Sequence, residues 1–463
     1  MKKILIWTLS LLMGNVCYAE DITIKYNGSK AKVTQHVKDS VNVIVDGANV
    51  SIESLYQGHK LTLLLTGKSD DGQLTLKTAG RAKIKLDNLT LTSQEGAPLC
   101  LKNKKKVEIV ATKGTQNKLT ITACNDTANH KAATIWAKGK LLLSGKGTLN
   151  IVATGDGCRG IKTKKDIAIE ELTLSVTTSG NNLGEKPFSF GGFPGMPEGG
   201  FKMPEGGFPN FGGFPMPNDS TMQGGFAGKH KYVASTKGIA SKGKITINSG
   251  NVTVRTATAG AEGIEGKEGI VFNGGNIDVM SPDDAINANA TIEFNGAKVV
   301  ARSTGNDAVD SNPKGGFFMP FGGNNNQEDT DPAIIIRGGT VYAWSQVGSP
   351  EEGLDCDFAP LVVEGGTIFS VGGGMGEMPS VPTEKTAKQP TVLLIGVNIV
   401  ENEAVNIYDA GGKLVDTVTV PFSMQRSASL VSSPAFKTGG SYTVKTKGYE
   451  RTFTLTASFT TVR

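Results

Sequence analysis

The sequence predicts an all-β protein built as a right-handed parallel β-helix, a solenoid, with loop insertions rich in Gly, Pro and Met and a small C-terminal β domain. Three observations support this prediction. A unit of about 23 residues recurs, apolar residues alternate with period two inside each unit, and Asn-Gly or Gly-Gly turns separate the alternating stretches. One unit cannot bury its apolar face alone, so successive units must stack as coils.

The repeat is clearest in the middle of the chain. The apolar residue that opens each unit, called position zero, is Ile239, Ile264, Ile286 or Val309. The segments "ITINSGNVTVR", "IVFNGGNIDVM" and "IEFNGAKVVAR" follow the first three of these residues and share one pattern. Each unit has room for three short strands and shows no helical periodicity. Further coils with looser spacing are expected to begin at Leu101, Ile135, Ile161, Ala333 and Gly353.

The ends of the chain and two internal segments differ from the repeat. Residues 1–19 combine two lysines, an apolar run and an alanine before the expected cleavage point, which is typical of a signal peptide. The remaining chain is therefore expected to be secreted or held at the cell surface. The solenoid is expected over 20–389, and 390–463, which alternate without the coil period, form a C-terminal β domain or cap. The segments 183–229 and 313–331 are dense in Pro and Gly and are expected to be flexible insertions.

Composition narrows the functional classes. The net charge of +5 is too small for 463 residues to indicate nucleic-acid binding. No apolar run after the signal peptide approaches the roughly 20 residues that a membrane-spanning helix needs. The spacing of the four remaining cysteines fits neither a disulfide framework nor a zinc site. Buried thiols and one bridge, between Cys100 and Cys124, are the alternatives for Cys100, Cys124, Cys158 and Cys356.

Stacking turns equivalent positions of the repeat into columns whose members lie about 4.8 Å apart, the spacing of neighbouring strands. The column two places before position zero and the column one place after it both become acidic at the coil of Ile264. The two columns can share one face only if the small residue between them, Gly or Ala, bends the strand. The column three places after position zero holds Lys104, Lys138, Lys164, Lys242 and Lys267.

The acidic columns predict a metal. Carboxylates stacked in register repel each other, whereas calcium binds oxygen at about 2.3 to 2.6 Å, so one ion can bridge the acids of adjacent coils. A solvated acidic edge, which would protect the stack against aggregation, is the open alternative. The predicted calcium ligands are Glu262, Glu265, Asp283, Asp284, Asp307, Asp310, Glu351, Glu352 and Asp355.

Several motifs together resemble a known family, the secreted β-helix carbohydrate-binding proteins that are similar in fold to pectate lyases. They are "AEGIEG", "PDDAINAN", "GNDAVDSN", the closure "EGGTIFSVGGGMGEMP", the Gly-Met-Pro-Phe insertions and the tail "LVSSPAFKTGGSYTV". The resemblance covers most of the chain after the signal peptide. It implies calcium and the binding of pectic or cellulosic polysaccharide. The family's calcium ligands would fall on Glu262, Glu265, Asp283, Asp284, Asp307 and Asp310.

The chain departs from the family pattern in two respects. Ala285 and Ala308 stand where Gly is commoner, and the early coils carry lysine instead of acid. The number of calcium sites therefore stays open.

Calcium beside a lysine column suits an acidic polysaccharide, so we expect a secreted, non-catalytic protein that binds a pectin-like or other plant cell-wall polymer. A calcium-dependent polysaccharide lyase and a structural surface adhesin are the alternatives. A lyase needs a base beside the metal, but neither Arg255, Arg302 nor Arg337 is singled out, and the four histidines are isolated. The residues expected to contact the polymer are Trp136, Lys138, Lys164, Lys242 and Lys267.

Overall fold

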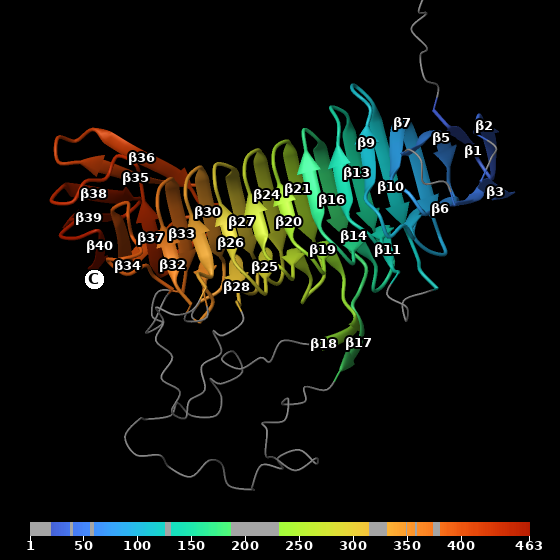
Figure 1. Cartoon of the computed structure of the whole chain (residues 1–463). Helices are drawn as coiled ribbons and strands as arrows, with labels where there is room; N and C mark the ends of the chain where they lie inside the picture. The colour runs from blue at the N-terminus through green and yellow to red at the C-terminus, as the bar shows by residue number, and fades with distance from the viewer. Residues whose placement is uncertain are drawn as a thin grey trace, which may run out of the picture.

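In a computed structural model of the chain, every regular element of the described residues is a β-strand (Figure 1). None of these residues belongs to a helix that is long and apolar enough to cross a membrane. The predicted signal peptide and most of both predicted insertions lie outside the described residues. The structure describes residues 20–37, 40–55, 60–125, 131–186, 231–313, 331–348, 350–356, 359–373 and 380–463.

The strands form four sheets. The 11-stranded sheet contains β3 (Val41–Asp46), β4 (Asn49–Ser54), β6 (Gln73–Thr78), β8 (Leu99–Leu101), β11 (Ala133–Ala137), β14 (Arg159–Thr163), β19 (Lys237–Ser241), β22 (Glu262–Gly266), β25 (Ile286–Ala288), β28 (Val309–Ser311) and β31 (Leu354–Asp355).

The 23-stranded sheet contains two runs of strands, which are parallel apart from one antiparallel pair at the N-terminal end, and their end strands. One run is β1 (Ile22–Asn27), β2 (Lys30–Gln35), β5 (Leu61–Ser69), β7 (Ala82–Ser93), β9 (Val107–Ala111), β12 (Leu141–Ser144), β15 (Ile167–Glu170), β20 (Ile245–Ile247), β23 (Ile270–Phe272), β26 (Ile292–Phe294), β29 (Ile334–Ile336) and β32 (Leu361–Val363). The other is β10 (Gln116–Ile121), β13 (Thr148–Ala153), β16 (Thr173–Thr178), β21 (Asn251–Thr256), β24 (Asn276–Ser281), β27 (Lys298–Ser303), β30 (Thr340–Ser345) and β33 (Thr367–Gly372). The end strands are β34 (Thr391–Ile399), β37 (Met424–Ser432) and β40 (Phe459–Val462).

Two small antiparallel sheets complete the structure. One is the pair β17 (Leu183–Lys186) and β18 (Lys231–Ala234), so the first four residues of the predicted insertion 183–229 are a strand. The other contains β35 (Ala404–Asp409), β36 (Leu414–Thr419), β38 (Ser441–Thr446) and β39 (Tyr449–Thr454).

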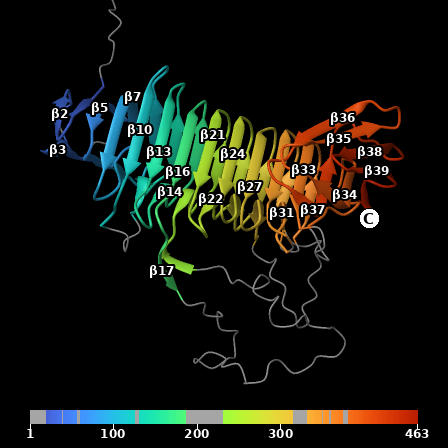
Figure 2. The same ribbon diagram turned by 180° about the vertical axis from the view of Figure 1, so that it is seen from behind.

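The elements stack as coils, as the 23-residue repeat predicts. Each middle coil contributes one strand to the 11-stranded sheet and two to the 23-stranded sheet, as β22, β23 and β24 do, and each strand pairs in parallel with its equivalent in the next coil. The views of Figures 1 and 2 show an elongated stack with the first strands at one end and the last strands at the other. The all-β solenoid is thus confirmed, whereas its right-handed winding stays a prediction.

The core is a column of apolar side chains along the stack. Ile264 pairs with Ile286 and Ile286 pairs with Val309, and all three side chains are fully buried. Phe272 and Phe294 of adjacent coils stack with ring centroids 5.1 Å apart. Each coil therefore buries its apolar face against its neighbours, which a single coil cannot do.

The register of one early coil differs from the predicted one. Leu99, not Leu101, pairs with Ile135, so Cys100 and not Lys102 lies beside Trp136. The sequence "LCLKNKKK" offers two leucines at the same parity, so alternation alone could not choose between them. This shift of two residues matters for the lysine column described below.

The two ends of the stack close differently. At the N-terminal end, β1 pairs with β2 and β3 pairs with β4 in antiparallel hairpins. At the C-terminal end, β37 pairs with β33 in antiparallel orientation, and Trp344 and Phe369 of the last coils share a buried apolar cluster with the strands that follow. The C-terminal segment predicted to be β is therefore β, and it covers the end of the core.

Candidate functional site

The two acidic columns lie on one face of the 11-stranded sheet because the strand bends between them. A Cβ on Gly263 would lie 2.4 Å from Val279 Cγ1 and 2.4 Å from the Ala285 carbonyl oxygen, so this position points into the core. Ala285 and Ala308, its equivalents, are fully buried. The next residue of each coil is also a core residue. The positions on either side of this pair consequently both point away from the apolar core, as the predicted bend requires.

Lys237, which was not among the predicted site residues, lies in the coil just before the first acidic coil and pairs with that coil's glutamates. Lys237 Nζ lies 2.8 Å from Glu262 Oε2 and 2.7 Å from Glu265 Oε1, and its side chain is only 10% exposed. Lys267 Nζ lies 2.5 Å from Glu265 Oε1. One ammonium group thus links both columns. Glu262 and Glu265 are paired with lysine charges.

These charges give the two glutamates different pKa values. Burial opposes ionisation of Glu265, but Lys237 and Lys267 outweigh it and lower its pKa to about 2. Burial raises the pKa of Glu262, and the attraction of Lys237 only partly offsets this effect. Glu265 is therefore a fixed anion, and the ion pair with Lys237 is a buried one whose loss would leave an uncompensated charge.

In the next two coils asparagine amides lie between the carboxylates. Asn287 Nδ2 donates to Asp284 Oδ2 at 2.7 Å and to Asp310 Oδ2 at 3.0 Å. Asn306 Nδ2 donates to Asp283 Oδ1 and to Asp284 Oδ1, each at 2.7 Å. Acids from successive coils are thus brought together in one cluster, which we call the acidic cluster, comprising Asp283, Asp284, Asp307 and Asp310.

Burial and neighbouring acids strongly perturb the Asp307 carboxyl group of the acidic cluster. Its side chain accepts a hydrogen bond from the Glu352 amide, yet burial and the negative charges of Asp355, Glu351 and Asp310 raise its pKa to about 9. A carboxyl group in this state indicates that the acidic cluster holds more negative charge than its surroundings accommodate.

The last predicted ligands lie in the following coil. Ser380 connects two of them, because its amide donates to Glu352 Oε2 at 2.7 Å and its hydroxyl donates to Asp355 Oδ1 at 3.3 Å. Asp355 pairs with Asp310 across β28 and β31. Glu351 is half-buried and contributes to the charge that acts on Asp307.

The chemistry of the acidic cluster suits an oxygen-preferring cation, since its groups are carboxylates and amides at buried positions; Asp284 and Asp310 are each 1% exposed. Within the described part of the chain, however, no three His, Cys, Asp or Glu side chains are arranged as a metal centre. The predicted calcium sites therefore remain a prediction.

The lysine column is an exposed row on the same sheet. Backbone hydrogen bonds join neighbouring coils at these lysines. The amides of Lys138, Lys164, Lys242 and Lys267 donate, in this order, to the carbonyl groups of Leu101, Ala137, Thr163 and Ser241. The register shift places Lys102, not Lys104, next to Lys138, because the Lys138 amide donates to the Leu101 carbonyl. We call the following set the lysine row: Lys77, Lys102, Lys138, Lys164, Lys242 and Lys267.

Trp136 occupies a different environment from the one its predicted sugar-stacking role requires. Its side chain is 4% exposed and packs with Ala97, Cys100 and Ala133. Lys164 Nζ lies 5.9 Å from its ring centroid. The ring has no exposed face, so packing, together with this cation–π contact, accounts for its position.

Two basic residues near Trp136 escaped the sequence analysis. Lys162 pairs with Trp136 in the adjacent coil, and burial together with the charges of Arg159 and Lys242 lowers its pKa to about 7. Arg159 donates to the Ser235 carbonyl at 2.9 Å and to its hydroxyl at 3.0 Å. Lys162 lies in a column whose later members are acidic. A lysine at this position was therefore the feature of the sequence that could have pointed to Lys162.

The three arginines considered for lyase chemistry lie on the 23-stranded sheet or its turns. Arg255 forms an ion pair with Asp278, and Arg337 pairs with Glu293 at 2.7 Å. Arg302 donates to Gln346 at 2.9 Å. Each of them is held by partners away from the acidic cluster. The cysteines Cys100, Cys124, Cys158 and Cys356 carry thiols, so the bridge between Cys100 and Cys124 is not formed.

Comparisons with known proteins give one matching family and one structural match. A structural match is the "polysaccharide lyase-like protein from C. thermocellum", solved as a gadolinium derivative, with 19% identity, a TM-score of 0.40, and coverage of 60% of this chain and 90% of that one. No curated protein matches. The family described as "Carbohydrate-binding domain-containing protein" matches residues 46–187 and 218–308, slightly more than half of the sequence. The chain therefore belongs to the family of carbohydrate-binding domain-containing proteins.

Proposed function

We propose that this protein is a non-catalytic binder of acidic polysaccharide and that the polymer lies along the outer face of the 11-stranded sheet. The observation that carries the proposal is the lysine row, in which exposed ammonium groups recur once per coil along the stack. Like charges at this spacing destabilise a sheet. A polymer whose acid groups recur along its length would neutralise several of them at once, and the gain would grow with polymer length.

We extend the proposal to calcium at the acidic cluster. Asp284, Asp307 and Asp310 are the favoured ligands, with Glu351, Glu352 and Asp355 in the following coil. Calcium would supply positive charge to carboxylates that burial has taken out of water. Glu262 and Glu265 are less suited, because Lys237 and Lys267 already lie against them.

Retention on immobilised polygalacturonate, measured with calcium and with EDTA, tests the function. We expect retention without release of unsaturated products, which absorb in the ultraviolet, and weaker retention in EDTA. Release of such products would replace binding by lyase activity, and absence of retention in both conditions would favour a structural adhesin. Neutral cellulose serves as the uncharged comparison polymer.

Paired substitutions separate the metal from the polymer. Asp284→Asn with Asp310→Asn should abolish the rise in melting temperature that calcium gives the wild-type protein. Asp46→Asn with Asp70→Asn, two exposed acids at other positions, is the matched control. Less than one calcium per purified chain, measured by mass spectrometry, would refute the metal site while leaving the lysine row untouched.

Two further expectations accompany the proposal. The chain is exported after removal of 1–19, which N-terminal sequencing of the secreted protein would show as a start at Glu20. The solenoid winds to the right, and 390–463 form its C-terminal domain. An experimental density map would test both of these structural expectations.

A further inference from the structure

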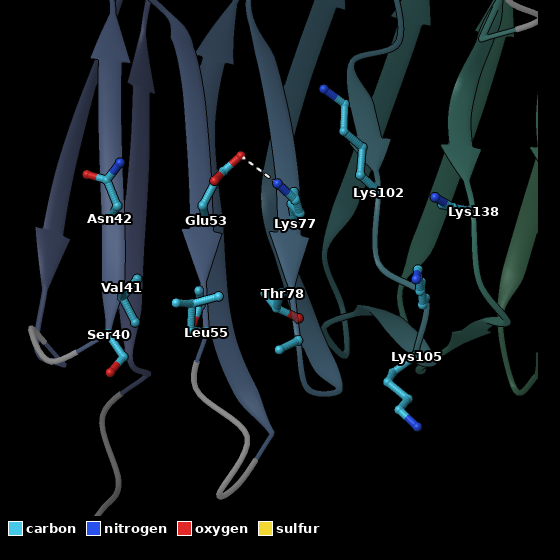
Figure 3. Close-up of a pocket in the computed structure, with 13 residues that line it drawn as sticks. Ser40, Val41, Asn42, Glu53, Leu55, Lys77, Thr78, Lys102, Lys105 and Lys138 are labelled. Carbon is cyan, nitrogen blue, oxygen red and sulfur yellow. Dashed lines mark hydrogen bonds and ion pairs between the residues drawn. The ribbon is translucent and has the colours of Figure 1, made fainter.

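A groove of about 750 Å³ opens at the N-terminal end of the 11-stranded sheet (Figure 3). It crosses β3, β4 and β6 and ends at the turns that follow β8 and β11. Its size is within the range of about 300 to 1,000 Å³ that is typical of small-ligand sites. Neither the proposed calcium site nor the acidic cluster contributes to it, since their first residue, Asp283, follows β24.

The groove carries a large excess of positive charge. Its lining includes one carboxylate, Glu53, whose Oε1 lies 3.3 Å from Lys77 Nζ, with both side chains about 60% exposed. An ion pair exposed to this extent contributes little. The other lysines of the lining form no ion pair with any described residue, and they are Lys102, Lys104, Lys105 and Lys138. Ammonium groups gathered in a concave site attract anions and concentrate them there.

The groove also has an apolar wall. Leu55, which is 83% exposed, and Ala79, which is half-buried, lie among its lining residues. Val41 lies at its edge in Figure 3. Apolar surface next to well-placed charges is the usual composition of a binding site. The C–H face of a sugar ring matches the wall, and the acid group of the same sugar matches the lysines, whereas an inorganic anion would use the lysines only.

The groove is continuous with the lysine row. Lys77, Lys102 and Lys138 belong to both, because the Lys102 amide donates to the Leu76 carbonyl and the Lys138 amide donates to the Leu101 carbonyl. The two lysines that only the groove possesses, Lys104 and Lys105, come from the turn after β8. A polymer that follows the lysine row toward the N-terminal end would thus reach a concave site with additional charge and an apolar wall.

We infer that this groove is a separate, calcium-independent subsite that binds a short run of uronic-acid residues, one end of an acidic polysaccharide. The inference rests on the proposed function for the choice of an acidic sugar. It adds a place on the molecule at which a short oligomer binds without metal. Lys102 and Lys105, which are labelled in Figure 3, would hold carboxylates, and Leu55 would contact the ring.

Binding of trigalacturonate in EDTA, measured by isothermal titration calorimetry, tests the inference. Lys102→Gln with Lys105→Gln should weaken binding about five- to tenfold, the sum of two exposed charge contacts. Lys113→Gln with Lys118→Gln, two exposed lysines near β10 of the other sheet, should leave it unchanged. Leu55→Ser should weaken trigalacturonate binding without altering the salt dependence of that binding. Neutral cellotriose should not bind.

The outcomes separate this inference from the proposed function. If trigalacturonate does not bind in EDTA, or if both lysine pairs weaken it equally, the groove is not the subsite. Retention of long polygalacturonate by the same preparation would then leave the proposed function standing. A different outcome would refute the lysine row and retain the groove. In that case the trimer binds in the groove, substitutions in the groove abolish binding of the long polymer, and Lys164→Gln with Lys242→Gln leave that binding unchanged.

Discussion

At the scale of single residues, burial gives two ionisable groups opposite effects on the pH dependence of stability. Asp307 has its pKa raised to about 9 by burial and neighbouring acids, and Lys162 has its pKa lowered to about 7 by burial and neighbouring cations. The folded structure therefore favours the neutral form of each group. The pH dependence of unfolding should report both, because the unfolded chain returns each group to its ordinary pKa.

The wild-type protein should lose stability as the pH rises from about 4 to about 9, and Asp307→Asn should abolish this loss. In that window the unfolded chain has released the Asp307 proton and the folded chain retains it, so stability falls as pH rises, by at most about 1.4 kcal/mol per pH unit. Urea unfolding in EDTA from pH 5 to pH 7 measures the slope. Equal slopes in wild type and variant would show that Asp307 is ionised in the folded protein.

Lys162→Met should act in the opposite direction. Between about pH 7 and pH 10.5 the unfolded chain binds a proton that the folded chain has lost, so the wild-type stability rises with pH through this group. The variant should lack that rise and should be more stable than wild type at pH 6, where the buried charge is present in full. Urea unfolding at pH 6 and pH 9 checks it; a variant less stable at pH 6 would contradict it.

At the scale of the strand, a small residue decides which side chains meet. Gly263, Ala285 and Ala308 point into the core just before the apolar residue of their coils. The strand can turn two neighbouring positions inward only where one of them is small. This local bend is the reason that Lys237 reaches both Glu262 and Glu265 and that Asn287 reaches both Asp284 and Asp310.

Gly263→Ala should therefore destabilise the protein by about 1 to 3 kcal/mol, the cost of overpacking a filled core. The added methyl group would meet Val279 and the Ala285 carbonyl, each at 2.4 Å. Thermal unfolding measures the effect. Gly412→Ala tests a glycine with no neighbour within 4 Å, although its positive φ of 78° imposes its own strain. A Gly263 variant as stable as wild type would mean that the backbone bends without a small residue.

At the scale of the whole molecule, stacking of the repeat places a positively charged region and an acidic region along one sheet. The lysine row runs from β6 to the turn after β22, and the acidic cluster begins in the next coils. Both halves lie on the 11-stranded sheet, while the 23-stranded sheet closes the rest of the coil. A long acidic polymer would meet ammonium groups first and the proposed calcium afterwards.

Neutralising the middle of the lysine row should weaken polymer binding at low salt. Lys138→Gln, Lys164→Gln and Lys242→Gln together should lower affinity for polygalacturonate about tenfold at 50 mM salt and much less at 500 mM, where screening is strong. The triple Lys25→Gln, Lys113→Gln and Lys118→Gln removes the same charge from the other sheet. Equal losses in both triples would show that net charge, and not the row, attracts the polymer.

The solenoid, the order of its coils and most of its columns could be predicted from the repeat in the amino-acid sequence. Period-two alternation inside a repeating unit leaves stacking as the only way to bury the apolar residues, so Ile239, Ile264, Ile286 and Val309 fall in one core column as expected. The same repeat aligned the lysines from Lys138 onward and the acids from Glu262 onward.

The repeat did not predict which of these side chains contact each other, because that depends on packing between coils. The choice of Leu99 over Leu101, the entry of Lys237 between two glutamates, the burial of Trp136 and the groove beside Leu55 depend on contacts between coils and on the end of the stack. A repeat specifies that equivalent residues are neighbours. It does not specify how far each side chain reaches or what covers it, because these depend on the shapes of residues more than 20 positions apart.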